Sequence, residues 1–185
     1  SLVTRALLRF LLSACTHQNP NSFEFIENEY GKPDLKPGCL EIPLKFNLSH
    51  SSGVIACVLA LGHEIGVDIE NHRRKIDLDI ADRFFSKSEA EYLSKCPDRD
   101  KQTVFFDLWT LKESYIKAKG MGLSIGLDKF SFEIGKKNIS INFHESLKDY
   151  RDQWQFIKFS PIKNFTAAIS IQTSLKTRLK LHIHK

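Results

Sequence analysis

Two acidic residues near the end of a predicted strand have the spacing of a metal site. They lie in the segment Ile65-Gly-Val-Asp68-Ile-Glu70. Side chains two residues apart on a strand point to the same face, so both carboxylates lie on one side of it. Mg²⁺ suits such a pair, because it takes one or two carboxylate oxygens and leaves positions for water and phosphate. The pair alone, however, is better explained as a solvated strand end.

A third carboxylate and two groups suited to phosphate strengthen the metal interpretation. In Trp109-Thr-Leu-Lys-Glu113-Ser-Tyr-Ile-Lys117, Glu113 and Lys117 are four residues apart and share one helix face. Such a pair is most often a surface salt bridge worth about 0.3–0.5 kcal/mol. Joined to the first two acids, it would make a site for a metal and a phosphate. The hydroxyl and imidazole of Ser49-His50 suit a phosphate as well, although a histidine between serines is usually a polar loop residue.

The elements that must position these residues follow from hydrophobic periodicity. Leu8, Leu11 and Leu12 predict one buried face of a helix over Leu2–Cys15. Further helices are predicted over Ile76–Phe85, from the capping box at Ser86 to Lys95, and over Asp100–Lys119. Strands are predicted over Phe23–Ile26, Leu44–Ser49, Val54–Leu61, Glu64–Glu70, Phe130–Ile134, Ile139–Phe143, Trp154–Phe159, Thr166–Ile171 and Leu179–His184. Tyr30–Pro33 predicts a turn with Lys32 at its tip, and the whole order suggests two similar α+β halves.

Composition limits the classes of protein to consider. The 185 residues are 42% hydrophobic and 26% charged, which is typical of a globular chain. A net charge of +5 favours an anionic partner without choosing one. The four cysteines form no CxxC pair, which favours reduced thiols in a cytoplasmic protein. The longest apolar run, Val54–Leu61, is far shorter than the ~20 residues of a membrane span, so we expect no membrane association.

Five segments in order resemble one known family. Gly66–Glu70 followed by Trp109–Lys117 is similar to the paired signature of phosphopantetheinyl transferases, and three further segments match motifs of that family: Tyr30–Pro33, Asn47–Ser51 and Arg83–Glu89. The resemblance runs from about Arg9 to Phe132 and is to the surfactin-synthetase type. It implies an α+β monomer of two pseudo-symmetric halves, each a helix on a small, mainly antiparallel sheet, with the active site between them. The halves would be residues 1–63 and 64–185, and the second would carry the metal-binding motifs.

The resemblance also implies an activity and a set of site residues. Members of the family move the 4′-phosphopantetheine arm of coenzyme A onto a serine of an acyl or peptidyl carrier protein and release adenosine 3′,5′-bisphosphate. Mg²⁺, with Mn²⁺ as an alternative, would be held by Asp68, Glu70 and Glu113. The implied contacts with coenzyme A are Arg9, Tyr30, Gly31, Lys32, Pro33, Ser49, His50, Lys112 and Lys117. Lys117 would stabilise or protonate the leaving phosphate, and Glu113, directly or through a metal-bound water, would be the base, with Glu89 as the second candidate.

A cationic run beside the proposed site suits an acidic carrier protein. Arg73, Arg74 and Lys75 follow the metal strand, and the next predicted helix ends in Phe84-Phe85. A solvated charged loop is an equally good interpretation. The same acids would also serve a Mg²⁺-dependent hydrolase of a nucleotide pyrophosphate. A nucleic-acid-binding module is a more distant alternative, because the basic residues are scattered and three acids would line the cleft.

Overall fold

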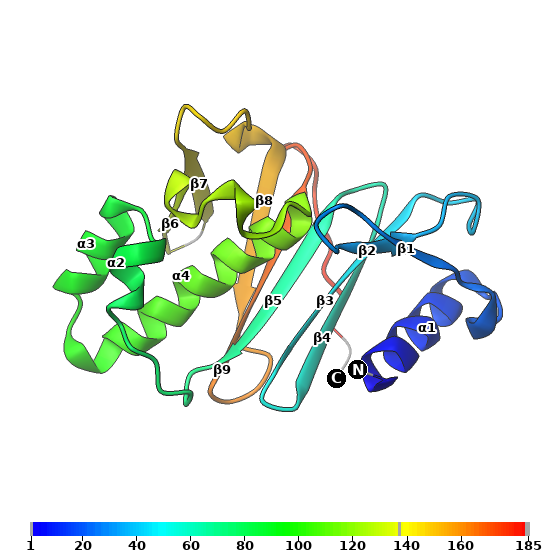
Figure 1. Cartoon of the computed structure of the whole chain (residues 1–185), viewed down its shortest axis with the longest axis horizontal. Helices are drawn as coiled ribbons and strands as arrows, with labels where there is room; N and C mark the ends of the chain where they lie inside the picture. The colour runs from blue at the N-terminus through cyan, green and yellow to red at the C-terminus, as the bar shows by residue number, and fades with distance from the viewer. Residues whose placement is uncertain (1, 137, 184–185) are drawn as a thin grey trace.

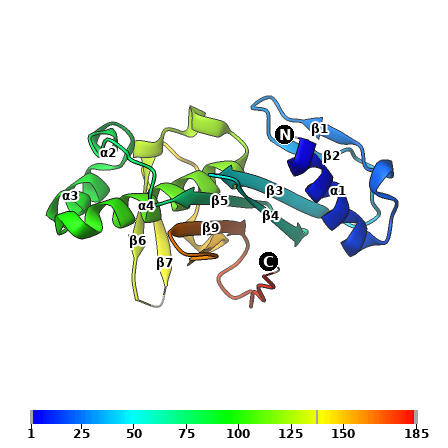
Figure 2. The same cartoon turned by 90° about the horizontal axis from the view of Figure 1, so that it is seen from below.

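The computed structural model describes residues 2–136 and 138–183. The molecule is elongated, with α1 (Leu2–Thr16) at one end and α2 (Ile80–Phe84) and α3 (Lys87–Lys95) at the other (Figure 1, Figure 2). Helices and small antiparallel sheets make an α+β fold, which confirms the predicted fold class. Among the described residues, no helix combines the length and apolar character needed to cross a bilayer.

The first part of the chain packs α1 against two hairpins. One pairs β1 (Phe25–Glu27) with β2 (Pro33–Leu35), and the other pairs β3 (Leu44–Ser51) with β4 (Val54–Leu61). The buried side chains between them come from α1, from the segment before β1 and from β3: Leu8, Leu12, Phe23 and Phe46. Of the leucines that predict the buried face of α1, Leu8 and Leu12 are buried and Leu11 is half-buried.

The rest of the chain places a long helix on a three-stranded antiparallel sheet. The sheet has the order β5 (Ile65–Asn71), β9 (Phe165–Gln172), β8 (Trp154–Phe159), and the helix is α4 (Asp98–Lys119) (Figure 1). A further hairpin joins β6 (Phe130–Ile134) to β7 (Ile139–Phe143). Short 3₁₀ helices complete the elements: Pro20–Ser22, Gly122–Ile125, Leu127–Lys129 and Arg151–Gln153.

Small residues let α4 approach β5 closely. A Cβ atom on Gly66 would lie 2.0 Å from the Ser114 carbonyl oxygen and 2.4 Å from the Ala118 nitrogen. The hydroxyl of Ser114 on α4 is also hydrogen-bonded at 2.7 Å to that of Ser170 on β9, the strand next to β5, and both side chains are fully buried. Glu113 and Lys117 directly precede Ser114 and Ala118 on α4, so the close approach of the helix fixes the distance of Glu113 and Lys117 from β5.

β3 lies beside β5 and is joined to it by side chains. Asn47 Oδ1 accepts the Val67 N–H at 3.0 Å, and Ser49 Oγ accepts the Ile69 N–H at 3.4 Å. The polar residues of β3 that face β5 are two apart, as expected when alternate side chains of a strand share a face. This seam joins the two predicted halves, whose boundary at residue 63/64 stays a prediction.

Besides shifts of a few residues at the ends of elements, the structure differs from the sequence prediction in three places. The helix predicted from Ile76 begins at Ile80, because residues 77–80 form a turn in which the Asp79 N–H donates to Asp77 Oδ1 at 3.1 Å. No strand forms over 179–183, where alternate apolar side chains are 42% (Leu181) and 50% (Ile183) exposed; residue 184 of that prediction lies outside the described residues. Finally, Pro33 opens β2 instead of closing an exposed turn.

Candidate active site

The seam between β3 and β5 carries the predicted carboxylates on its polar face. The Ser49 hydroxyl donates to Asp68 Oδ1 at 2.8 Å, and the Ser51 hydroxyl donates to Glu70 Oε2 at 2.8 Å. All four side chains are buried. The alternation of the two strands therefore places two hydroxyl–carboxylate pairs side by side.

Lys117 reaches this seam from α4. Its ammonium lies 2.6 Å from Asp68 Oδ1 and 3.0 Å from Ser49 Oγ. The other Asp68 oxygen, Oδ2, is buried and has no hydrogen-bond partner, the one such side-chain atom among the described residues. Asp68 thus has one satisfied oxygen and one oxygen open to a further positive group.

Three carboxyl groups share the same electrostatic surroundings. Burial raises the pKa of Asp68, although Lys117 and Ser49 favour its charged form. Burial likewise raises the pKa of Glu70, with Ser51 opposing and the charge of Asp68 adding to the shift. For Glu113, burial and then the charge of Asp68 raise the pKa. Each charged form would be favoured by a cation placed among them.

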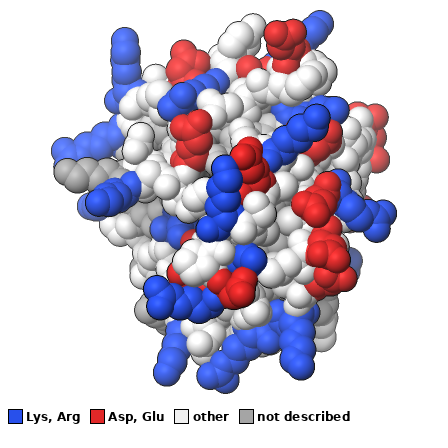
Figure 3. Space-filling view, turned by 90° about the vertical axis from the view of Figure 1, so that its left-hand side faces the viewer, with Lys and Arg blue, Asp and Glu red and all other residues white. Residues whose placement is uncertain are grey.

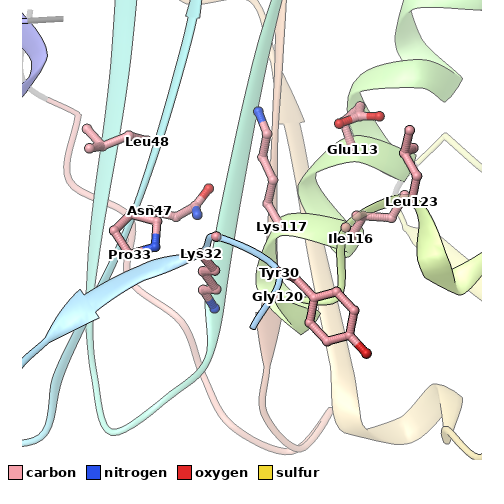
Figure 4. A pocket seen from close by; sticks show the side chains of 12 residues that line it. Tyr30, Lys32, Pro33, Asn47, Leu48, Glu113, Ile116, Lys117, Gly120 and Leu123 are labelled. Atoms are coloured by element: carbon pink, nitrogen blue, oxygen red, sulfur yellow. The ribbon is translucent and has the colours of Figure 1, made fainter. Parts of the chain in front are cut away.

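Two adjoining hollows open onto these groups. A cavity of about 350 Å³ is lined by the turn at 30–33, by β3 and by the end of α4, and one of about 390 Å³ is lined by the polar seam and by α4. Leu48, Glu113 and Lys117 line both, so the two hollows adjoin. Figure 4 shows Glu113 and Lys117 projecting from α4 on one side of the first cavity, opposite Asn47 and Leu48.

The donor chemistry of the site fits a hard divalent cation. Asp68, Glu70 and Glu113 supply carboxylate oxygens. Such an ion would give the unpaired Asp68 Oδ2 the partner that it lacks. The carboxylates do not already stand in ligand geometry, because the described residues contain no group of three or more His, Cys, Asp or Glu arranged to hold a metal. Instead, the Lys117 ammonium forms an ion pair with Asp68 Oδ1.

Most of the predicted contacts with coenzyme A line the two hollows. Tyr30, Gly31 and Pro33 line the first, and Ser49 and His50 line the second. The stem of Lys32 also lines the first hollow, but its ammonium points away from that of Lys117 (Figure 4) and is held by other partners, described below.

Three predicted site residues lie elsewhere. Lys112 and Glu89 are both buried and form an ion pair of 2.7 Å, while Lys112 Nζ also donates to two backbone carbonyls. Both Glu89 oxygens are engaged, by Ser86, Lys112 and the Phe132 N–H. Lys112 and Glu89 therefore line neither hollow in this structure, and both Glu89 oxygens are engaged by other groups. Arg9 lines neither hollow; it donates to the Pro20 carbonyl at 2.6 Å.

Some lining residues were not predicted as part of the site, although Arg74 was predicted at the surface that docks the carrier protein. Arg74 and Trp109 line the second hollow, and Arg74 Nη1 lies 3.6 Å from Glu70 Oε2. The sequence places Arg74 four residues after Glu70, but this spacing predicts a contact only on a helix, whereas Glu70 is on a strand. Ile116 and Leu123 form an apolar wall of the first hollow. Apolar residues such as these cannot be told from core residues by their type in the sequence.

Known proteins with similar sequences point to one family. Residues 64–170, more than half of the chain, match the family described as the 4′-phosphopantetheinyl transferase superfamily. The chain is 33% identical over 169 residues to the 4′-phosphopantetheinyl transferase HetI of a Nostoc species, a match that covers 90% of this chain and 68% of HetI. It is 38% identical over 150 residues to the 4′-phosphopantetheinyl transferase Sfp of Bacillus subtilis, covering 79% and 63%. The chain thus spans about two thirds of the length of these relatives.

A solved structure supports the same fold. The crystal structure of holo-(acyl-carrier-protein) synthase from Thermotoga maritima aligns with a TM-score of 0.50 and 18% identity, covering 60% of this chain and 63% of that one. These matches confirm the resemblance found in the motifs and give no support to the hydrolase alternative. The chain therefore belongs to the 4′-phosphopantetheinyl transferase superfamily, a family of enzymes, and is similar to its Sfp-type members.

Proposed function

We propose that this protein transfers the 4′-phosphopantetheine group of coenzyme A to a serine of an acyl or peptidyl carrier protein. The observation that carries the proposal is the cluster of Asp68, Ser49 and Lys117, which adjoins Glu70 and Glu113 at the junction of the two hollows. Phosphoryl transfer needs positioned positive charge more than covalent help, and such a cluster provides it.

The reaction is a displacement at the phosphorus that bears the pantetheine arm. The carrier serine oxygen forms a bond to that phosphorus, and the bond to the bridging oxygen of adenosine 3′,5′-bisphosphate breaks. Glu113 is proposed to take the serine proton, because its raised pKa suits a base, and Lys117 to neutralise the charge on the leaving phosphate. Mg²⁺, held by Asp68, Glu70 and Glu113, would supply charge neutralisation at the pyrophosphate.

The two hollows divide in a way that suits coenzyme A. Tyr30, Ile116 and Leu123 give the first an aromatic and apolar lining, suited to the adenosine end. Ser49, His50 and Lys117 give the second donors suited to phosphate oxygens.

The carrier protein is proposed to dock beside the loop that follows β5. Arg73 and Lys75 of this loop are exposed, and Figure 3 shows Lys and Arg side chains gathered along the lower edge of the face formed by α2 and α3, while the rest of that face mixes both signs. Phe85, predicted as a docking residue, is only 4% exposed and belongs to the core, and Phe84 packs edge-on against Trp109. The proposed surface therefore consists of the cationic loop without Phe85.

We also propose a monomer in the cytoplasm. One chain supplies both sides of the site, since Ser49 comes from β3 and Lys117 from α4. All four cysteines are free thiols, as expected in a reducing compartment.

Intact-mass measurement of apo carrier proteins, incubated with coenzyme A and Mg²⁺, tests the proposal. We expect a gain of one phosphopantetheine arm on at least one carrier, lost in Glu113→Gln and kept in Glu91→Gln, which changes an exposed acid paired with Lys95. Cleavage of coenzyme A at the same rate without any carrier would favour a hydrolase. No mass gain on any carrier with folded protein would contradict the proposed transfer.

A further inference from the structure

The turn between β1 and β2 is fastened to the end of α4 by one asparagine. Asn28 Oδ1 accepts the N–H groups of Tyr30 and Lys32, both at 2.9 Å, and Asn28 Nδ2 donates to the Gly120 carbonyl at 2.7 Å. Gly120 is the left-handed C-cap of α4, with φ 68°. A single side chain thus orders the turn and attaches it to the helix that carries the site.

Lys32 makes a second attachment at the same place. Its ammonium donates to the Ala118 carbonyl at 2.7 Å and pairs with Glu64 Oε2 at 2.7 Å, and its side chain is only 14% exposed. The last carbonyls of a helix lack partners within the helix and carry partial negative charge, so a lysine there is favourable. Lys32 therefore caps α4.

Glu64 joins this attachment to the neighbouring strand. Its other oxygen, Oε1, lies 3.3 Å from Lys45 Nζ on β3. Burial alone would raise the pKa of Glu64, but Lys32 and Lys45 outweigh burial and lower it. Glu64 thus stays charged between two cations.

We propose that Asn28, Lys32 and Glu64 form a clasp that positions the wall of the coenzyme A pocket, an inference that rests on the proposed function. The turn that the clasp holds supplies Tyr30, Gly31 and Pro33 to one side of the first hollow, and the end of α4 supplies the other side. The clasp sets the distance between these sides. Lys32 is then a positioning residue, in place of the direct contact with phosphate that the motif suggested.

Close packing of the Lys32 stem supports this assignment. A Cβ atom on Gly120 would lie 2.7 Å from Lys32 Cδ, so the stem lies directly against the helix cap. Turning the ammonium toward a bound phosphate would leave the Ala118 carbonyl without this donor and Glu64 without its nearest cation. Both losses disfavour the direct contact.

Initial-rate kinetics with coenzyme A and with 3′-dephospho-coenzyme A distinguish the clasp from a direct contact between Lys32 and the 3′-phosphate. Three variants remove one member of the clasp each: Lys32→Met, Glu64→Gln and Asn28→Ala. We expect each to raise the KM for coenzyme A by about tenfold, the size expected on losing a charged hydrogen bond, with little change in kcat. Coenzyme A and 3′-dephospho-coenzyme A should be affected equally, and Lys32→Arg should recover part of the loss. Lys36→Met, which removes an exposed pair with Glu24, is the matched control and should leave KM unchanged. A direct contact with the 3′-phosphate predicts instead that Lys32→Met harms coenzyme A alone and that Glu64→Gln harms neither substrate; that result would overturn the clasp.

Amide hydrogen exchange tests the clasp without any substrate. We expect residues 28–33 to exchange faster in Glu64→Gln and Asn28→Ala than in the original protein or in Lys36→Met, because the turn loses its attachment to α4. Unchanged exchange in both variants would overturn the proposal. A protein that shows this faster exchange but transfers nothing to any carrier would contradict the proposed function and leave the clasp supported.

Discussion

Asp68 has two carboxylate oxygens with different surroundings. Oδ1 accepts from Ser49 and Lys117, whereas Oδ2 is buried without a partner. A buried polar atom left unsatisfied costs about 1–3 kcal/mol, which a bound cation would recover. At the scale of single residues, this oxygen is the strongest sign of where a metal would bind.

The metal assignment predicts different losses for the three acids. Asp68→Asn and Glu113→Gln should lower transfer by about 10²-fold or more, while Glu70→Gln should lower it less, because water can replace an outer ligand. Removal of Mg²⁺ with a chelator should have the same effect as the first two substitutions. Steady-state rates and thermal unfolding measure both activity and folding, and all three variants should fold because each change reduces the mutual repulsion. Near-normal turnover of Asp68→Asn and Glu113→Gln in Mg²⁺ would contradict the assignment.

Lys117 should act on turnover more than on binding. Its charge matters most when the leaving phosphate gains charge, so Lys117→Met should lower kcat by about 10²–10³-fold with a smaller change in the KM for coenzyme A. Initial-rate kinetics over a range of coenzyme A concentrations separate the two constants. A large rise in KM with unchanged kcat would instead mean that Lys117 serves ground-state binding.

At the scale of elements, the distance between α4 and β5 determines whether the site can form. Gly66 is required there because a Cβ would meet backbone atoms that cannot rotate away. We expect Gly66→Ala to lower the free energy of unfolding by about 3 kcal/mol, the upper part of the range for overpacking. Gly38→Ala is the control: it has open space around it but a positive φ, so it should lose about 1 kcal/mol. Equal losses in urea unfolding would show that α4 can move away from β5.

The Lys112–Glu89 pair holds α4 to α3 and to the segment around β6. Lys112 is fully buried, with Glu89 and the carbonyls of Leu127 and Phe130 as partners. Removing one member of a buried pair leaves an uncompensated charge, so Lys112→Met should cost about 3–5 kcal/mol of unfolding free energy. Lys95→Met, which removes an exposed pair, should cost at most about 1 kcal/mol. If Lys112→Met unfolds like the original protein but fails to transfer, Lys112 has a direct role in the reaction.

Elements with strong periodicity could be predicted from the sequence, and those set by tertiary contacts could not. The strands Val54–Leu61 and Trp154–Phe159 have the predicted bounds because each is a short run rich in apolar residues that ends at turn residues, Gly62 after the first and Ser160-Pro161 after the second. The i,i+4 rule correctly placed Glu113 and Lys117 on one face of α4. It could not show that the lysine pairs with Asp68 across the seam, since that contact depends on how closely α4 approaches β5.

Neighbouring residues of one motif face different surroundings for a simple geometric reason. Lys112 and Glu113 are adjacent on a helix, so their side chains diverge by about 100°. Glu113 faces the hollows, whereas Lys112 points into the core, where it pairs with Glu89. Lys32, similarly, cannot be assigned from its turn alone, because its partners come from residues 64 and 118.

At the scale of the whole molecule, the cationic loop after β5 has a fixed position. The Gln102 amide donates to the carbonyls of His72 and Arg74, and the His72 ring stacks on Phe106 at 5.7 Å, so α4 holds the loop. Burial lowers the pKa of His72, so this histidine adds no charge at neutral pH. The loop presents its cations from a defined backbone, which favours a role in orienting an acidic partner.

Charge reversal in this loop should slow capture of the carrier protein without changing the binding of coenzyme A. Arg73 and Lys75 are better targets than Arg74, because Arg74 lines the second hollow beside Glu70. The double variant Arg73→Glu, Lys75→Glu should raise the KM for the carrier at low salt and flatten its dependence on salt, since steering by exposed charge is screened within about 10 Å at 0.1 M salt. Lys176→Glu with Arg178→Glu, in the segment after β9, changes the net charge equally and serves as the control. Equal KM values for the two double variants would place the docking surface away from the loop, because the effect would then follow net charge and not position.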